Sequence, residues 1–174
     1  MKLQNINKMV YRKHLNVVTI ALVAGLIILS LAFGTGLIAL FSEINNVSAE
    51  LKSNFYLNLL GVVMAAIISV TVLMYFRHHP YMTEVYYIWR LKALHNRIYR
   101  KLKQIKSAAS NHDIDALVIL SFYYQSLKLV YQLDNNTLTL SKLQQNIDEL
   151  ELSVSQHHLT VSADKFNRDL LNKF

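Results

Sequence analysis

The sequence of 174 residues lacks cysteine and contains only one proline and four glycines. The absence of cysteine excludes a disulfide framework, thiol catalysis and a cysteine-ligated zinc site. No glycine follows position 61, which excludes a glycine-rich phosphate-binding loop from the rest of the chain. Charged residues make up only 17% of the sequence, against about a quarter in soluble proteins, and 53% of the residues are apolar. This composition indicates a membrane protein.

Two long segments carry the excess of apolar residues. Residues 17–41 and 55–76 contain no Asp, Glu, Lys, Arg or His. At about 1.5 Å per residue, each is long enough as a helix to cross a hydrocarbon core of roughly 30 Å. We therefore predict two transmembrane helices joined by a short external loop at 42–54. Aromatic residues that flank them, such as Tyr11 and Tyr81, are expected at the membrane interface.

A cleaved signal peptide is the alternative explanation of the first apolar segment, because Val47-Ser48-Ala49 resembles a small-residue processing site. The apolar region of a secretory signal is about 7 to 15 residues long. Residues 17–41 form a run of 25 residues, which favours an uncleaved membrane anchor.

Basic residues beside the two segments predict their orientation. Residues 1–16 hold four basic residues and no acidic one, whereas the loop 42–54 holds two acidic residues and one basic. Residues 77–106 hold eight basic residues against Glu84 alone. The positive-inside rule then places both termini in the cytoplasm. The predicted organisation is a basic cytoplasmic N-terminus, a two-helix hairpin and a cytoplasmic helical domain over 77–174.

Small residues form a row on each predicted membrane helix. These rows consist of Ala21, Gly25, Ala32 and Gly36 on the first helix, and of Gly61, Ala65 and Ser69 on the second. Rows of this kind let helix backbones approach closely in lipid. Packing of the two helices on each other is the favoured interpretation, and association between subunits is the alternative. Neither span contains an ionisable residue of the kind that proton relays and ion pathways use.

The rest of the chain is predicted to form helices separated by short turns. Pro80 should end the second membrane helix, because proline lacks an amide hydrogen and clashes with the preceding turn. Apolar residues then recur every three or four positions between 85 and 105, and residues 107–112 supply a turn. Asp113 and Asp115 suit the N-terminus of the next helix, whose dipole favours acidic groups.

Residues 116–133 are apolar except for one narrow polar stripe. They form either the central helix of a bundle or a third membrane span, and the second reading would place Lys128 and two glutamines in lipid. The cost of burying these polar groups in a bilayer favours the bundle.

Two further helices are expected after a turn at residues 134–136. Residues 140–154 show the heptad spacing of a bundle helix, with a capping box at Ser141 and Gln144. Ser162 suits the start of a last short helix whose apolar edge should dock on the bundle. The predicted fold is all-α: a two-helix transmembrane hairpin followed by a cytoplasmic bundle of three to four helices.

A cluster of basic residues next to the second span is the strongest predicted contact surface. It comprises Arg77, Arg90, Lys92, Arg97, Arg100, Lys101, Lys103 and Lys106, with Trp89 among them. Basic residues held at the inner leaflet attract anionic lipid. The nearby aromatic residues are expected at a membrane interface, which disfavours nucleic acid as the ligand. The acidic residues of 107–174 are expected to pair with this basic helix, within one chain or between subunits.

Catalytic and metal-binding motifs are missing from the sequence. It contains no HExxH, G-x-S-x-G, Walker or dinucleotide-binding pattern. The histidine pairs 78–79 and 157–158 consist of neighbouring residues, which point about 100° apart on a helix and do not form a metal site by themselves. We therefore predict no enzyme activity, no catalytic residue, no metal and no cofactor.

Four runs of residues resemble a family of small bacterial membrane proteins of unknown function. These runs are YRKHLN at 11–16, RHHPYMTEVYYIWRLK at 77–92, FYY at 122–124 and LDNNT at 133–137. The resemblance covers nearly the whole chain. It implies a bacterial inner-membrane location with two membrane spans, and it brings no activity, cofactor or catalytic residue.

Two functional hypotheses follow. The first is a membrane-anchored interaction or scaffold protein, in which the hairpin holds a helical bundle at the inner leaflet and the basic helix contacts anionic lipid or another inner-membrane protein. The second is a homo-oligomeric channel. Two spans cannot enclose a pore alone, so a channel needs several copies, and its uncharged spans would gate it hydrophobically.

Overall fold

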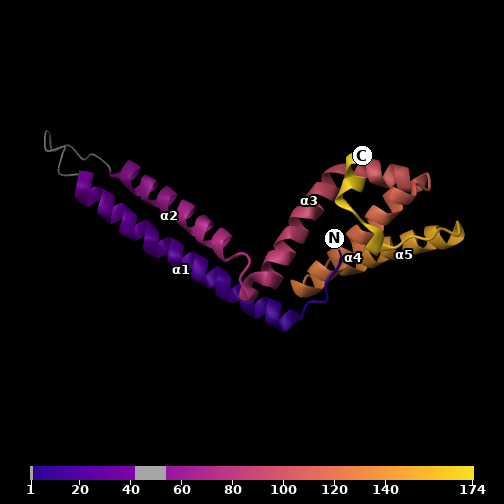
Figure 1. Ribbon diagram of the computed structural model, residues 1–174, viewed down its shortest axis with the longest axis horizontal. Helices are drawn as coiled ribbons and strands as arrows, with labels where there is room; N and C mark the ends of the chain where they lie inside the picture. The colour runs from indigo at the N-terminus through magenta and orange to yellow at the C-terminus, as the bar shows by residue number, and fades with distance from the viewer. Residues whose placement is uncertain (1, 42–53) are drawn as a thin grey trace. The chain divides into compact units, whose positions relative to one another are not determined.

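The computed structural model describes residues 2–41 and 54–174, and these residues form helices and turns without a strand (Figure 1). The α-helices are α1 (Lys8–Phe41), α2 (Phe55–Phe76), α3 (Thr83–Ser110), α4 (Ile114–Leu133) and α5 (Leu140–Gln156). Three short 3-10 helices are also present: η2 (Pro80–Met82) between α2 and α3, and η3 (Ala163–Lys165) and η4 (Arg168–Lys173) after α5. The predicted all-α fold is confirmed. Residues 42–53 of the predicted external loop, with the processing-site resemblance at 47–49, lie outside the described residues.

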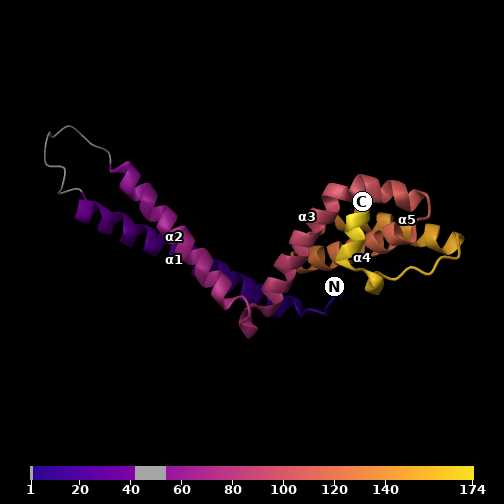
Figure 2. The same ribbon diagram turned by 45° about the horizontal axis from the view of Figure 1, so that its top comes forward.

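The chain divides into two compact units. One unit is a hairpin unit, Lys13–Thr83, and the other is a helical unit that combines the N-terminal stretch up to Arg12 with Glu84–Phe174. In the hairpin unit, α1 and α2 run side by side in opposite directions (Figures 1 and 2).

Both hairpin helices are long and apolar enough to span a membrane. Helix α2 begins and ends at the predicted residues, whereas α1 begins at Lys8, before the predicted span. Pro80 is the first residue of η2, and α2 has already ended at Phe76. The predicted break between α2 and a new helix is present around Pro80, but α2 ends at Phe76, before the proline.

Helices α1 and α2 approach each other closely at Gly34 and Gly61. A Cβ atom added to Gly61 would lie 2.7 Å from the amide nitrogen of Gly34. The other two members of the predicted row on α2, Ala65 and Ser69, are also buried. Only residues without a side chain allow two backbones to come this close.

The predicted row on α1 does not make this approach. Ala21 and Ala32 are exposed, and a Cβ atom added to Gly25 or Gly36 would meet no atom within 4 Å. The prediction missed Gly34, because a row chosen by the spacing of small residues does not show which face of the helix a partner covers. Whether the α1 row joins separate copies of the chain stays a prediction.

In the helical unit, α4 is the central helix. Eleven of its residues are buried: Ala116, Leu117, Val118, Ile119, Leu120, Phe122, Tyr123, Tyr124, Ser126, Val130 and Leu133. Helix α5 and the 3-10 helices η3 and η4 all pack against it. Residues 116–133 are thus a core helix, and the two candidate spans in the described chain are α1 and α2.

The C-terminal segment docks on the bundle as predicted. The rings of Phe166 and Phe122 are stacked, with centroids 4.0 Å apart and planes 9° apart. Leu171 is also buried. Ser162 caps η3, since its hydroxyl accepts a hydrogen bond from the amide of Asp164.

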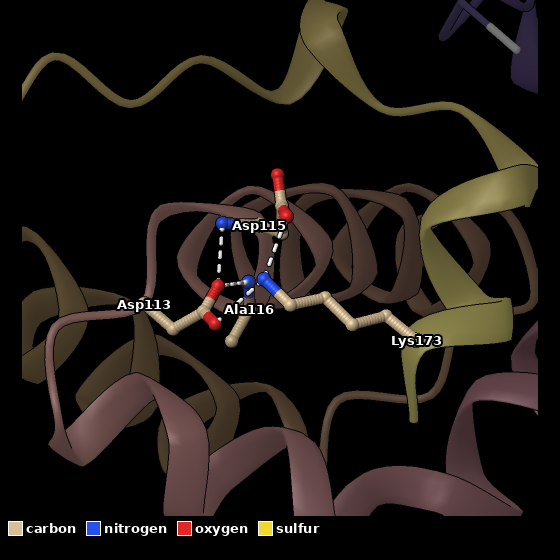
Figure 3. Close-up of polar contacts among 4 residues, drawn as sticks. All are labelled: Asp113, Asp115, Ala116 and Lys173. Atoms are coloured by element: carbon tan, nitrogen blue, oxygen red, sulfur yellow. Dashed lines mark hydrogen bonds and ion pairs between the residues drawn. The ribbon is translucent and has the colours of Figure 1, made fainter.

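Polar contacts fix the start of α4 (Figure 3). Asp113 is the N-cap, and its Oδ1 accepts hydrogen bonds from the amides of Asp115 and Ala116 at 2.9 and 3.2 Å. Lys173 pairs with the carboxylates of Asp113 and Asp115, each at 2.8 Å. The hydrogen bond from Lys173 is the main reason why the pKa of Asp113 is lowered. The predicted acidic helix start is confirmed, and its carboxylates also hold the C-terminal segment.

Two local predictions differ from the structure. Helix α3 continues to Ser110, so the predicted turn is confined to its last residues, where His112 takes a positive φ of 61°. The capping box of α5 is wrong: Thr139 is the N-cap and makes no side-chain cap hydrogen bond. Gln144 instead accepts a hydrogen bond from Lys128 at 2.8 Å and donates one to Asp148 at 2.7 Å. This contact between helices replaces the local cap.

We expect Gly61→Ala to destabilise the hairpin, because the new methyl group would overlap the backbone at Gly34. Overpacking of this kind costs about 1–3 kcal/mol. The melting temperature of the full chain in dodecyl maltoside should fall. Gly36→Ala is the matched control, since its Cβ meets open space, and an equal fall for both variants would contradict this account.

Candidate interaction surface

Helix α3 has one buried and one exposed side. Its buried side comprises Tyr87, Ile88, Leu91, Leu94, His95, Ile98, Ile105 and Ala109. The exposed side carries two large aromatic residues, Trp89 at 63% and Tyr99 at 68% exposure. Arg90, Arg97, Arg100, Lys103 and Lys106 are exposed as well. We call these seven residues the basic face of α3.

The other three members of the predicted basic cluster do not belong to this face. Lys92 pairs with Asp134 at 2.7 Å, and Lys101 donates a hydrogen bond to the backbone oxygen of Leu171 at 2.7 Å. Both lysines therefore hold parts of the helical unit together. Arg77 precedes α3 and lies in the hairpin unit, where its Nε donates to Nε2 of His78 at 3.0 Å.

The positive charge of the basic face is not neutralised by ion pairs among the described residues. The ion pairs found there join Lys92 to Asp134 and Lys173 to Asp113 and Asp115. The predicted pairing of distal acids with the basic helix thus holds within one chain for Lys92 alone. The guanidinium of Arg90 lies over the ring of Tyr86, 5.8 Å from its centroid.

The positions on the basic face follow from helical geometry. At about 100° per residue, Trp89, Arg100 and Lys103 lie within about 60° of one another around the helix. An aromatic ring and two cations are thus aligned on one side of α3. Such a surface suits a ligand that combines negative charge with apolar groups.

The N-terminal stretch packs into the helical unit. Tyr11 is 2% exposed, and its hydroxyl donates a hydrogen bond to Oδ1 of Asp134 at 3.4 Å. The hydroxyl of Tyr87 accepts a hydrogen bond from the amide of Gln4 at 3.1 Å and donates one to the backbone oxygen of Lys2 at 3.2 Å. The prediction that Tyr11 lies at a membrane interface is wrong, because its ring is buried within this unit.

A buried polar pair joins α3 to α4. His95 is 7% exposed and Ser126 is fully buried, and His95 Nε2 lies 2.7 Å from Ser126 Oγ. The hydroxyl of Ser126 donates to the backbone oxygen of Tyr123 at 2.9 Å, so His95 supplies the proton of the shared hydrogen bond. Burial, together with the smaller effect of the positive charge on Lys92, lowers the pKa of His95 to about 4. No substrate can reach a serine at 0% exposure, so this pair is structural.

Sequence reasoning missed this pair, although one signal was present. His95 lies four residues after Leu91 and three before Ile98, which places it on the apolar side of the helix. A histidine at such a position needs a buried partner. Ser126 could not be named as that partner, because it comes from another helix.

Two other histidines lie close together. The rings of His112 and His157 lie 3.7 Å apart, from turns that are distant in sequence. In the described part of the chain, no group of three or more His, Cys, Asp or Glu side chains is placed to hold a metal ion.

One comparison with known proteins gives a match, and it covers nearly the whole chain. Residues 1–171 match the family described as protein of unknown function (DUF3087). The chain belongs to this family. Neither the curated proteins nor the solved structures gave a match. Membership of the DUF3087 family confirms the predicted resemblance, and it carries no activity with it.

In this DUF3087 protein, we expect Tyr11→Ala to release the N-terminal stretch from the helical unit. Truncation of a buried aromatic side chain costs about 3–5 kcal/mol. Amide hydrogen exchange of residues 2–12, measured by mass spectrometry on the full chain in detergent, should become faster. Met9→Ala is the control, because Met9 is 83% exposed. Equal exchange in both variants would show that Tyr11 does not hold this stretch.

His95 should make the stability of the helical unit depend on pH. Its pKa is about 4 in the folded protein and 6.5 in the unfolded chain, so only the unfolded chain binds a proton between these values. Stability is therefore complete above pH 6.5 and falls toward pH 4, by up to about 3 kcal/mol. Thermal unfolding followed by circular dichroism between pH 7.5 and 5 should show this loss.

His95→Gln should lessen the pH dependence, whereas His157→Gln at an exposed helix end should retain it. If His95→Gln loses stability with falling pH as steeply as the unaltered protein, the assignment to His95 is wrong.

Proposed function

We propose that the protein is a membrane-anchored helical interaction protein of the bacterial inner membrane, with both termini in the cytoplasm. The α1–α2 hairpin is the anchor, and the basic face of α3 binds the anionic headgroups of the inner leaflet. The observation that carries this proposal is the set of exposed arginines and lysines on α3, which have no acidic partner in the described residues.

Two further features support a lipid surface as the ligand. Helix α3 begins at Thr83, seven residues after the end of α2, so the chain keeps its first turns near the membrane. Trp89 and Tyr99 add exposed aromatic rings of the kind that concentrate at membrane interfaces. Nothing in this arrangement calls for a reacting group, and the proposal includes no catalysis.

The electrostatic contribution is moderate and depends on salt. Each basic residue close to an anionic surface contributes about 1 kcal/mol, and charges are screened beyond about 10 Å at 0.1 M ionic strength. Because the hairpin already retains the protein, this energy is available to fix how the helical unit lies on the leaflet. An acidic surface on another inner-membrane protein is a competing ligand. Assembly of several copies into a channel stays a prediction.

The single tryptophan of the chain provides the test, because Trp89 lies on the basic face. The full chain is placed in nanodiscs of phosphatidylcholine, either pure or mixed with phosphatidylglycerol. We expect the emission of Trp89 to shift to the blue and its quenching by acrylamide to weaken when phosphatidylglycerol is present. Added salt at 0.5 M should reduce this difference.

The double variant Arg100→Gln and Lys103→Gln should lose most of the difference between the two lipids. Lys142→Gln with Lys165→Gln is the matched control, since it removes two exposed positive charges from other elements. If Trp89 responds equally to both lipids in the unaltered protein, the basic face does not bind anionic lipid.

A further inference from the structure

The hairpin unit contains a groove that the proposed function does not use. It has a volume of about 390 Å³ and lies between α1 and α2, in the half of the hairpin nearer Pro80. Ala21, Gly25 and Leu29 line it from α1, and Val72 lines it from α2. His79 and Tyr81 line the end beyond α2. The volume falls within the range of ligand sites, about 300–1,000 Å³.

The small residues of α1 keep this groove open. Gly25 has no side chain, and a Cβ atom placed there would still meet no atom within 4 Å. The walls between the two helices are almost entirely apolar. Within a bilayer, the medium that fills such a space is hydrocarbon.

Basic residues lie close in sequence to the residues that line the groove at its end beyond α2. Arg77 directly follows the lining residue Phe76, and Lys13 lies about one helical turn before the lining residue Val17. Among the described residues, the hairpin unit contains no Asp or Glu. The ring of Tyr81 rests against the ring of His14, with centroids 3.7 Å apart. A ligand whose apolar part fills the groove would therefore present its polar part to cationic groups.

The chemistry of His79 and Arg77 suits a phosphate. Nδ1 of His79 accepts a hydrogen bond from the amide of Tyr81 at 3.3 Å, which leaves Nε2 as the donor nitrogen of this ring. Arg77 uses Nε toward His78, which leaves the terminal nitrogens of its guanidinium as donors. Guanidinium groups bind phosphate through pairs of hydrogen bonds.

We propose that the groove between α1 and α2 binds one acyl chain of an anionic phospholipid, with Arg77 and His79 holding its phosphate. This site shares no residue with the basic face of α3. It rests on the proposal that the hairpin spans a membrane, and not on the proposal that α3 contacts the leaflet.

Native mass spectrometry of the full chain tests this site. The protein is reconstituted in nanodiscs of equal parts phosphatidylglycerol and phosphatidylcholine and then released into dodecyl maltoside. We expect one retained phospholipid per chain, with phosphatidylglycerol enriched over its share. Gly25→Leu should reduce the retained lipid at least about tenfold, which corresponds to about 1.4 kcal/mol, because the new side chain fills the groove.

Gly36→Leu is the control, since it makes the same change on the same helix at a position outside the groove lining. It should retain lipid like the unaltered protein. Arg77→Gln tests the headgroup contact on a residue exposed at the surface. This variant should retain one lipid but lose the preference for phosphatidylglycerol.

Three results would overturn the proposal. They are release of all lipid by the unaltered protein, equal retention by Gly25→Leu, and a dimer that Gly25→Leu converts to monomer, because a second copy would then fill the groove. The double variant on the basic face, Arg100→Gln with Lys103→Gln, should leave the retained lipid unchanged. Gly25→Leu should leave the response of Trp89 to lipid unchanged, so the two proposals fail independently.

Discussion

Burial of α4 is the constraint on which the helical unit depends. Its apolar residues cover most of the helix circumference, so one neighbouring helix cannot remove them from water. Helix α5 and the C-terminal 3-10 helices all pack against it. The stacked rings of Phe122 and Phe166 show how the end of the chain is recruited to complete this core. The C-terminal segment therefore belongs to the fold and is not a free tail.

Polar contacts fix the positions of segments that burial of apolar residues alone does not determine. Lys173 joins the C-terminal segment to the first turn of α4 through two carboxylates. At the other end of α4, the carboxylate of Asp134 pairs with Lys92 and accepts a hydrogen bond from Tyr11. Ion pairs at exposed positions add little stability, but they select one arrangement among several of similar apolar burial. The pair of His95 and Ser126 does the same inside the core, where an unpaired polar atom would be costly.

Helix α3 has a buried side and an exposed basic side. Its buried stripe joins the core, and this orientation alone decides which of its basic residues face solvent. Lys92 and Lys101 are held by partners within the unit, whereas Arg97, Arg100 and Lys103 are left exposed. The proposed contact with anionic lipid is thus a consequence of how α3 packs, and not only of how many basic residues it contains.

The sequence by itself determined the all-α fold, the extent of α2 and the role of α4 as a core helix. These features follow from local patterns, since a run of uncharged residues or a repeat of apolar positions is sufficient to define them. Tertiary structure alone decided that Gly34 meets Gly61, that Tyr11 is buried beside Asp134, and that Gln144 binds Lys128 in place of a helix cap. Each of these contacts joins residues from separate elements. The spacing of residues along one helix does not show which partner covers which face, because that choice depends on how all the buried surfaces fit together.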